Sequence, residues 1–315
     1  MKVLKSWLMF LRMSQIESTL KPRDVEETLD IYFYRPLGYF VARAGKTLRL
    51  SPNAVTIISI FIGVAAGHLF YYRDIVINLW GIVLWVIADI LDSADGQLAR
   101  MTNTKSRFGR VLDGFATNII FLSMYTHLFL RMLGMGYSPW WGVLVLAGGV
   151  SHSLQSSMAD YYRNAYLKFV IDPEKSELHR ASDLRADYEA AGSHAHPFKK
   201  FLGWVYLDYT ERQEKLTKNF QKLRNRVESN YHNQLPDWFR EEYRRYNRPL
   251  LKYYAILTTN TRMIAMSICV LIGQPLAYFF VEAGAINIVM IVLSIYQERV
   301  SWKLTREVEA HGAVA

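Results

Sequence analysis

The chain has 315 residues, of which 51% are hydrophobic and 21% charged, and its formal net charge is +9. Apolar residues gather in long blocks with charges between them, a segregation that argues against a soluble globular protein. The basic residues flank these blocks, so the positive charge indicates a membrane surface and no nucleic-acid partner. The single cysteine, Cys269, excludes an intramolecular disulfide and a thiolate metal site.

Residues 1–50 are predicted to form one or two amphipathic helices on the membrane surface. The beginning of this segment is apolar but carries Lys5 and Arg12, as is typical of a helix that lies in the interface. Ser51 and Pro52 then mark the start of the first span, because a capping side chain followed by proline is typical of a first helical turn.

Six apolar blocks follow, and most are close to the roughly 20 residues that a helix needs to cross a bilayer. They lie at 53–72, 76–91, 111–133, 139–159, 253–280 and 283–296. The predicted fold is therefore an all-α integral membrane protein with six transmembrane helices, an N-terminal interfacial amphipathic helix and a helical cytoplasmic insert.

The same pattern divides the chain into four segments. An interfacial segment is followed by the first four spans with the carboxylate-rich motif described below, a charged helical insert, and the last two spans with a short tail. Their expected bounds are 1–50, 51–162, 163–250 and 251–315.

Lys and Arg predict the orientation of the spans. They are concentrated before the first span, in the loop between the second and third spans, and in the insert. The positive-inside rule places these parts and both termini in the cytoplasm. We expect a multi-pass protein of the inner or plasma membrane, if the source is bacterial, with its active site facing the cytoplasm.

The most informative stretch holds a cluster of carboxylates. Asp89, Asp92 and Asp95 are spaced by three and share one helix face, and Asp113 lies near the start of the next span. Unpaired acids at the edge of hydrocarbon are unfavourable by several kcal/mol, so these side chains require cations. Carboxylate oxygens prefer hard divalent ions, which predicts a site for Mg²⁺ or Mn²⁺.

Three neighbouring residues suit a diphosphate ligand. Gly96 follows Asp95 and lets a ligand approach the backbone, and Gly109 clears one face of the next helix ahead of Asp113. Arg100 lies about one turn beyond Gly96 and supplies positive charge. Metals that bridge diphosphate oxygens would complete such a site.

At these residues the chain resembles the CDP-alcohol phosphotransferase family. Seven positions match the family signature, namely Asp92, Asp95, Gly96, Ala99, Arg100, Gly109 and Asp113. Asn53 and Thr56 belong to a Pro-Asn-x-x-Thr segment like the one that often opens the first span of the family.

The resemblance implies six spans, usually a homodimer, and a two-metal site open to the cytoplasm. It implies that Asp92, Asp95 and Asp113 bind metal. The other matching residues would bind the CDP substrate, namely Asn53, Thr56, Gly96, Ala99, Arg100 and Gly109. In the family an acceptor hydroxyl attacks the phosphorus distal to cytidine, and CMP leaves.

One position departs from the family pattern. A fourth aspartate, usually a metal ligand and the base for the acceptor, is replaced by Thr117, which has no useful basicity at pH 7. Asp89 or His152 could replace it, so both are candidate catalytic residues beside Asp113. Alternatively, the acceptor supplies its own base, or the protein is an inactive scaffold.

The sequence says less about the substrates than about the metal site. Arg163 and Arg262 lie at or within apolar spans, where an arginine needs an anion, and together they could bind the phosphate of an acceptor. This favours transfer from CDP-diacylglycerol to inositol phosphate or a similar polyol phosphate. The alternative is transfer from CDP-ethanolamine or CDP-choline to a lipid alcohol. In either reaction one substrate is a lipid.

Overall fold

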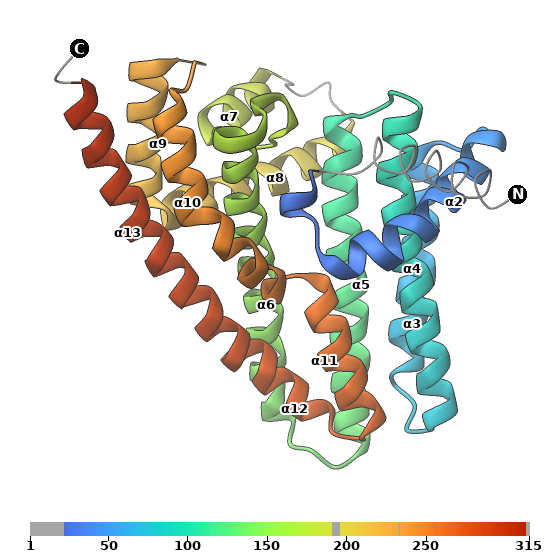
Figure 1. Cartoon of the computed structure of the whole chain (residues 1–315). Coiled ribbons are helices and arrows are strands. Elements are labelled where there is room, and N and C mark those ends of the chain that lie inside the picture. The colour runs from blue at the N-terminus through green and yellow to red at the C-terminus, as the bar shows by residue number, and fades with distance from the viewer. Residues whose placement is uncertain (1–21, 191–195, 233, 313–315) are drawn as a thin grey trace, which may run out of the picture. The chain divides into compact units, whose positions relative to one another are not determined.

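The computed structural model describes residues 22–190, 196–232 and 234–312, and every regular element in these ranges is a helix (Figure 1). The all-α prediction is confirmed to this extent. The described residues fall into two compact units. The first ends at Val145 and also includes Met266–Leu276, and the second takes Leu146–Ala265 and the chain from Ala277 onward.

The first unit contains four long helices. Short helices η1 (Arg23–Val25) and η2 (Asp30–Tyr34) precede them, and η3 (Pro139–Trp141) follows them. The long helices are α2 (Arg35–Thr47), α3 (Pro52–Leu69), α4 (Ile75–Met101) and α5 (Arg107–Gly134). The interfacial role of residues 1–50 stays a prediction, and residues 1–21 lie outside the described ranges.

Capping side chains mark the starts of these helices. Ser51 Oγ accepts a hydrogen bond from the Ala54 amide at 3.2 Å, with Pro52 in the first turn, as predicted. Ser106 Oγ accepts from the Gly109 amide at 3.0 Å and begins α5. These caps fix where each helix starts, and therefore how far along its helix each site residue lies.

Small residues allow α3 and α5 to approach closely. A Cβ atom added at Gly67 would lie 2.7 Å from Ser123 Oγ and 2.9 Å from the backbone nitrogen of Met124. Apolar helices in membranes commonly associate through such small residues, because the backbones can then make close van der Waals contact.

The second unit contains the predicted insert and the C-terminal helix. Its elements in chain order are α6 (Gly142–Tyr166), η4 (Leu167–Ile171), η5 (Pro173–Lys175), α7 (Ala181–Ala190), α8 (Pro197–Leu216), α9 (Lys218–Tyr231), α10 (Asp237–Tyr254), η6 (Ala255–Leu257), α11 (Thr259–Leu271), α12 (Pro275–Phe280), η7 (Val281–Ile286) and α13 (Asn287–Gly312). Three of them, α6, α11 and α12, begin or end in the first unit. The insert is therefore helical where it is described.

One carboxylate attaches the insert to the C-terminal helix. Glu298 on α13 accepts hydrogen bonds from the backbone amides of Asn219 at 2.7 Å and Phe220 at 3.2 Å. These amides are in the first turn of α9, where unpaired donors and the helix dipole favour a negative charge.

Within the described residues, four helical stretches are long and apolar enough to cross a membrane. They are Pro52–Leu69, Ile75–Met101, Asp237–Leu271 and Pro275–His311. Helices α5 and α6 coincide with the third and fourth predicted blocks but are not among these four. The chain therefore has the character of an integral membrane protein, and six spans remain a prediction.

Candidate metal and phosphate site

Three of the predicted aspartates lie together in the first unit. Asp92 and Asp95 come from α4 and Asp113 from α5, and one carboxylate oxygen of each lies within 4.8 Å of the others. The spacing of three residues places Asp92 and Asp95 on one side of α4, as the sequence predicted. Three converging carboxylates offer the oxygen donors that Mg²⁺ and Mn²⁺ prefer.

Thr56 is hydrogen-bonded to this cluster. Its hydroxyl on α3 donates to Asp95 Oδ2 at 2.5 Å, and Asp95 is only 5% exposed. This bond orients the Asp95 carboxylate. The structure thus gives Thr56 a positioning contact with Asp95, and its predicted part in substrate binding stays a prediction.

The predicted glycines lie beside the predicted polar residues. A Cβ atom added at Gly96 would lie 3.6 Å from two nitrogens of the Arg100 guanidinium. One added at Gly109 would lie 3.2 Å from Asn53 Oδ1. Both glycines therefore leave room next to a side chain that can bind an oxygen-rich ligand.

Ala99 contributes through its backbone. Its carbonyl accepts the Thr104 amide at 3.0 Å, just after the end of α4. This contact helps to form the turn between α4 and α5, which carry the aspartates.

Thr117, where the resemblance predicts a fourth aspartate, bonds to its own helix. Its hydroxyl lies 3.4 Å from the Asp113 backbone carbonyl, to which it donates. The neighbouring Asn118 also bonds its own helix, from Nδ2 to the Gly114 carbonyl at 2.8 Å. Both side chains are therefore directed to the backbone of α5.

Asp89 lies one turn before Asp92 on α4. It is not part of the carboxylate group found among the described residues. Its Oδ2 is buried and accepts no hydrogen bond from the described part of the chain. Asp89 therefore remains a candidate proton acceptor, although it does not complete the metal-binding set in this arrangement.

The other predicted residues, His152, Arg163 and Arg262, belong to the second unit. His152 is 4% exposed on α6, and Arg163 is partly exposed in the last turn of that helix. Arg262 is fully buried and donates to Glu282 Oε1 at 3.0 Å, to the Leu257 carbonyl at 2.6 Å and to Gln155 Oε1 at 2.6 Å.

The sequence analysis did not predict Glu282 as the partner of Arg262. Glu282 in η7 is 0% exposed and also accepts from the Tyr278 hydroxyl at 3.1 Å. A signal was present, since Arg262 and Glu282 are the only charged residues between positions 253 and 297. Each guanidinium nitrogen has a protein acceptor, so an internal ion pair accounts for Arg262 better than an acceptor phosphate does.

Comparison with known proteins agrees with the motif. Residues 49–167 match the family model described as CDP-alcohol phosphatidyltransferase, which confirms the resemblance over the stretch that carries the three aspartates. Solved structures gave no significant match.

Three curated relatives illustrate the similarity. An archaetidylinositol phosphate synthase of Pyrococcus horikoshii is 45% identical over 74 residues, which are 22% of this chain and 38% of that protein. A CDP-diacylglycerol–serine O-phosphatidyltransferase of Helicobacter pylori is 42% identical over 74 residues, with 24% and 30% covered. A putative cardiolipin synthase of Mycobacterium tuberculosis is 34% identical over 70 residues, with 22% and 31% covered. The chain thus matches only about a third of the length of these relatives.

Proposed function

We propose that the chain, through its CDP-alcohol phosphatidyltransferase domain at residues 49–167, transfers a phosphate-linked group from a CDP-alcohol to a second alcohol and releases CMP. The observation that carries this proposal is the convergence of Asp92, Asp95 and Asp113, within 4.8 Å, inside the matched stretch. Gathering three acids, one buried and two half-buried, is unfavourable without cations, so the cluster suits metal-assisted phosphate chemistry.

Asp92, Asp95 and Asp113 would hold Mg²⁺ or Mn²⁺, and we propose two ions. Their donor set fits, because all three offer carboxylate oxygens and Thr56 already orients Asp95. When bound, the metals supply positive charge that stabilises the diphosphate and the departing phosphate. Removal of the metal by a chelator should therefore stop the transfer reaction.

The remaining residues of the domain would bind the nucleotide. Arg100 would donate to diphosphate oxygens, with Gly96 leaving space beside it, and Asn53 and Gly109 would contact the same substrate. The acceptor oxygen then attacks the phosphorus distal to cytidine. That bond forms as the bond to the CMP oxygen breaks, and the acceptor proton passes to a base.

Asp89 and His152 are our candidates for that base, since the Thr117 hydroxyl is directed to the backbone. Loss of the true base by Asp89→Asn or His152→Ala should lower the rate of CMP release by about 10²-fold. Unchanged rates in both variants would instead assign the proton to the acceptor itself.

CDP-diacylglycerol with a polyol phosphate acceptor remains our preferred substrate pair. The archaetidylinositol phosphate synthase and the CDP-diacylglycerol–serine O-phosphatidyltransferase are relatives whose names contain such substrates or products. The buried pairing of Arg262 removes one of the two arginines first considered for the acceptor phosphate, so Arg163 is the remaining candidate. CDP-ethanolamine or CDP-choline with a lipid alcohol is the second candidate.

The same proposal includes the membrane arrangement. Helices α5 and α6 would complete six spans, with residues 1–50 at the interface, the 163–250 insert in the cytoplasm and the active site facing the same side. A homodimer in the inner or plasma membrane would agree with the family resemblance.

The decisive experiment uses the purified full chain with Mn²⁺ or Mg²⁺ and a panel of CDP-alcohols and acceptors. CMP release is the readout, and chelation of the metal is the control. We expect release from a CDP-diacylglycerol pair. If well-folded protein releases no CMP from any pair, the proposal fails and an inactive scaffold becomes the better account.

A further inference from the structure

Helix α8 carries three exposed aromatic side chains on its first two turns. Phe198, Phe201 and Trp204 are 41%, 45% and 52% exposed, and the rings of Phe201 and Trp204 stack at 6.3 Å. We refer to these three residues as the aromatic patch. A contiguous exposed aromatic group is unfavourable in water and usually marks an interaction surface.

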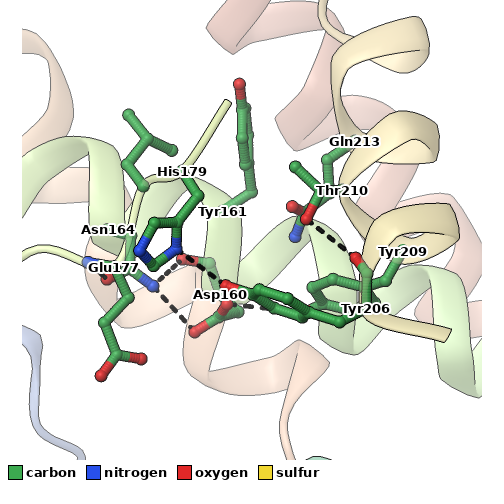
Figure 2. A pocket seen from close by; sticks show the side chains of 10 residues that line it. Asp160, Tyr161, Asn164, Glu177, His179, Tyr206, Tyr209, Thr210 and Gln213 are labelled. Carbon is green, nitrogen blue, oxygen red and sulfur yellow. Dashed lines mark hydrogen bonds between the residues drawn. The ribbon is translucent and has the colours of Figure 1, made fainter. Parts of the chain in front are cut away.

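The later turns of α8 are fixed within the second unit. Gln213 Nε2 donates to the Ser157 carbonyl on α6 at 2.9 Å, and the Tyr209 hydroxyl lies 3.4 Å from Asp160 Oδ2. Tyr206 and His179 are also bonded, at 2.9 Å (Figure 2). These contacts lie further along the helix than the aromatic patch, whose three side chains are 41–52% exposed.

Helix α8 lies near the points where the sequences of α6 and α13 change from apolar to charged. It runs across α6 rather than along it (Figure 1), and its contacts on α6 are at Ser157 and Asp160, where the apolar block 139–159 ends. Just after its C-terminal end, α9 begins against Glu298, directly beyond the apolar block 283–296. Both neighbours place α8 at the level of the membrane surface.

The composition of α8 fits that level. Trp and Phe are favoured at the boundary between headgroups and hydrocarbon, and lysine is attracted to anionic headgroups. Lys199 and Lys200 are interleaved with the aromatic patch. Further along the same face the side chains are charged, with Asp208 and Arg212 forming an ion pair, and that half suits water.

We propose that the first two turns of α8 anchor the insert to the bilayer that the chain's own spans cross. Phe198, Phe201 and Trp204 enter the headgroup region, with Lys199 beside lipid phosphates. The charged second half of the helix stays in water. This anchor does not depend on the proposed transferase activity.

A pair of labels on one face of α8 tests the proposal. In full-length protein with Cys269→Ala, we would place a fluorophore at Phe201→Cys or at Arg212→Cys. The two positions share a face and are about 16 Å apart along the helix. The protein would be reconstituted in vesicles of zwitterionic and anionic phospholipid, with a nitroxide quencher on a lipid near the headgroup.

We expect the lipid-borne quencher to reduce the signal at position 201 at least about twofold more than at position 212. A label at 201 that is as open to aqueous iodide as the label at 212 would overturn the anchor. A label shielded from both quenchers would also overturn it, because protein, such as a second copy of the chain, would then cover the patch. Trp204→Cys provides a second probe if the first variant is poorly folded.

Discussion

At the residue scale, the hydroxyl of Thr117 serves its own helix. It lies 3.4 Å from the Asp113 carbonyl, a weak bond that the helix does not require. Thr117→Val should therefore leave the rate of CMP release within about threefold, because a neutral hydroxyl contributes no base. Asp113→Asn should lower that rate by at least about 10²-fold, because it removes a charged carboxylate from the cluster.

Glu189→Gln, a change of an exposed acid on α7, is the control for the Asp113 variant and should leave the rate unaltered. If Thr117→Val were as inactive as Asp113→Asn, the Thr117 hydroxyl would do more than bond its own helix. The threonine would then be a part of the reacting site.

Thr56 offers a second prediction at this scale, through its 2.5 Å bond to Asp95 Oδ2. Side chains that orient metal ligands typically contribute about 10- to 100-fold to metal affinity. Thr56→Val should raise the Mn²⁺ concentration needed for half-maximal activity by that factor, and excess Mn²⁺ should restore the rate. Thr47→Val, at the exposed end of α2, is the matched control; equal metal dependence in both variants would refute the positioning role.

At the element scale, a buried ion pair joins α11 to η7. Arg262 and Glu282 are both 0% exposed and their side chains meet at 3.0 Å. Removing one partner of a buried pair is destabilising by about 3–5 kcal/mol, whereas replacing both with apolar residues is often neutral. Glu282→Gln should therefore lower the unfolding temperature clearly, and the double variant Arg262→Met with Glu282→Leu should recover most of the loss.

The double variant also separates structure from substrate binding. Thermal unfolding in detergent gives the stability, and CMP release at varied acceptor concentration gives KM. If Arg262 serves only the fold, the stable double variant keeps a normal acceptor KM. A large rise in KM with intact stability would return Arg262 to the acceptor site.

These elements also show how far sequence alone could reach. The common face of Asp92 and Asp95 follows from helical spacing, which is local, and the start of α3 follows from Ser51 and Pro52. The bonds from Thr56 to Asp95 and from Arg262 to Glu282 join residues 39 and 20 positions apart. Such partners depend on which helices pack together. The sequence marks Arg262 and Glu282 as the only charges in their apolar stretch, but it carries no comparable signal for the bond from Thr56 to Asp95.

At the scale of the whole molecule, a cluster of ion pairs joins the start of the predicted 163–250 insert to helix α9 within it. Glu228 on α9 accepts from Lys168 on η4 at 2.6 Å, from Arg224 at 3.1 Å and from Arg180, which precedes α7. Arg224 also donates to the Leu178 and His179 carbonyls. One carboxylate thus links three parts of the second unit.

The pKa of Glu228 makes this link sensitive to acid. Burial alone would raise that pKa, but the hydrogen bonds from Arg180 and Lys168 and the nearby positive charges outweigh it and lower the pKa to about 2. Because the folded pKa is below the ordinary value of 4.5, the unfolded chain binds the proton more readily. The stabilisation is therefore complete above about pH 4.5 and is lost as the pH falls from there towards 2.

Glu228→Gln should reduce the free energy of unfolding by about 1–3 kcal/mol at neutral pH, the scale of hydrogen bonds to charged groups. The difference from the native chain should shrink as the pH falls below 4.5. The Glu228 carboxylate of the unfolded native chain then takes up a proton, whereas that of the folded chain, with a pKa of about 2, stays charged. Unfolding midpoints measured between pH 7 and pH 3 test this, with Glu189→Gln as the exposed control. A difference that stays constant over that range would show that the charge of Glu228 does not stabilise the insert.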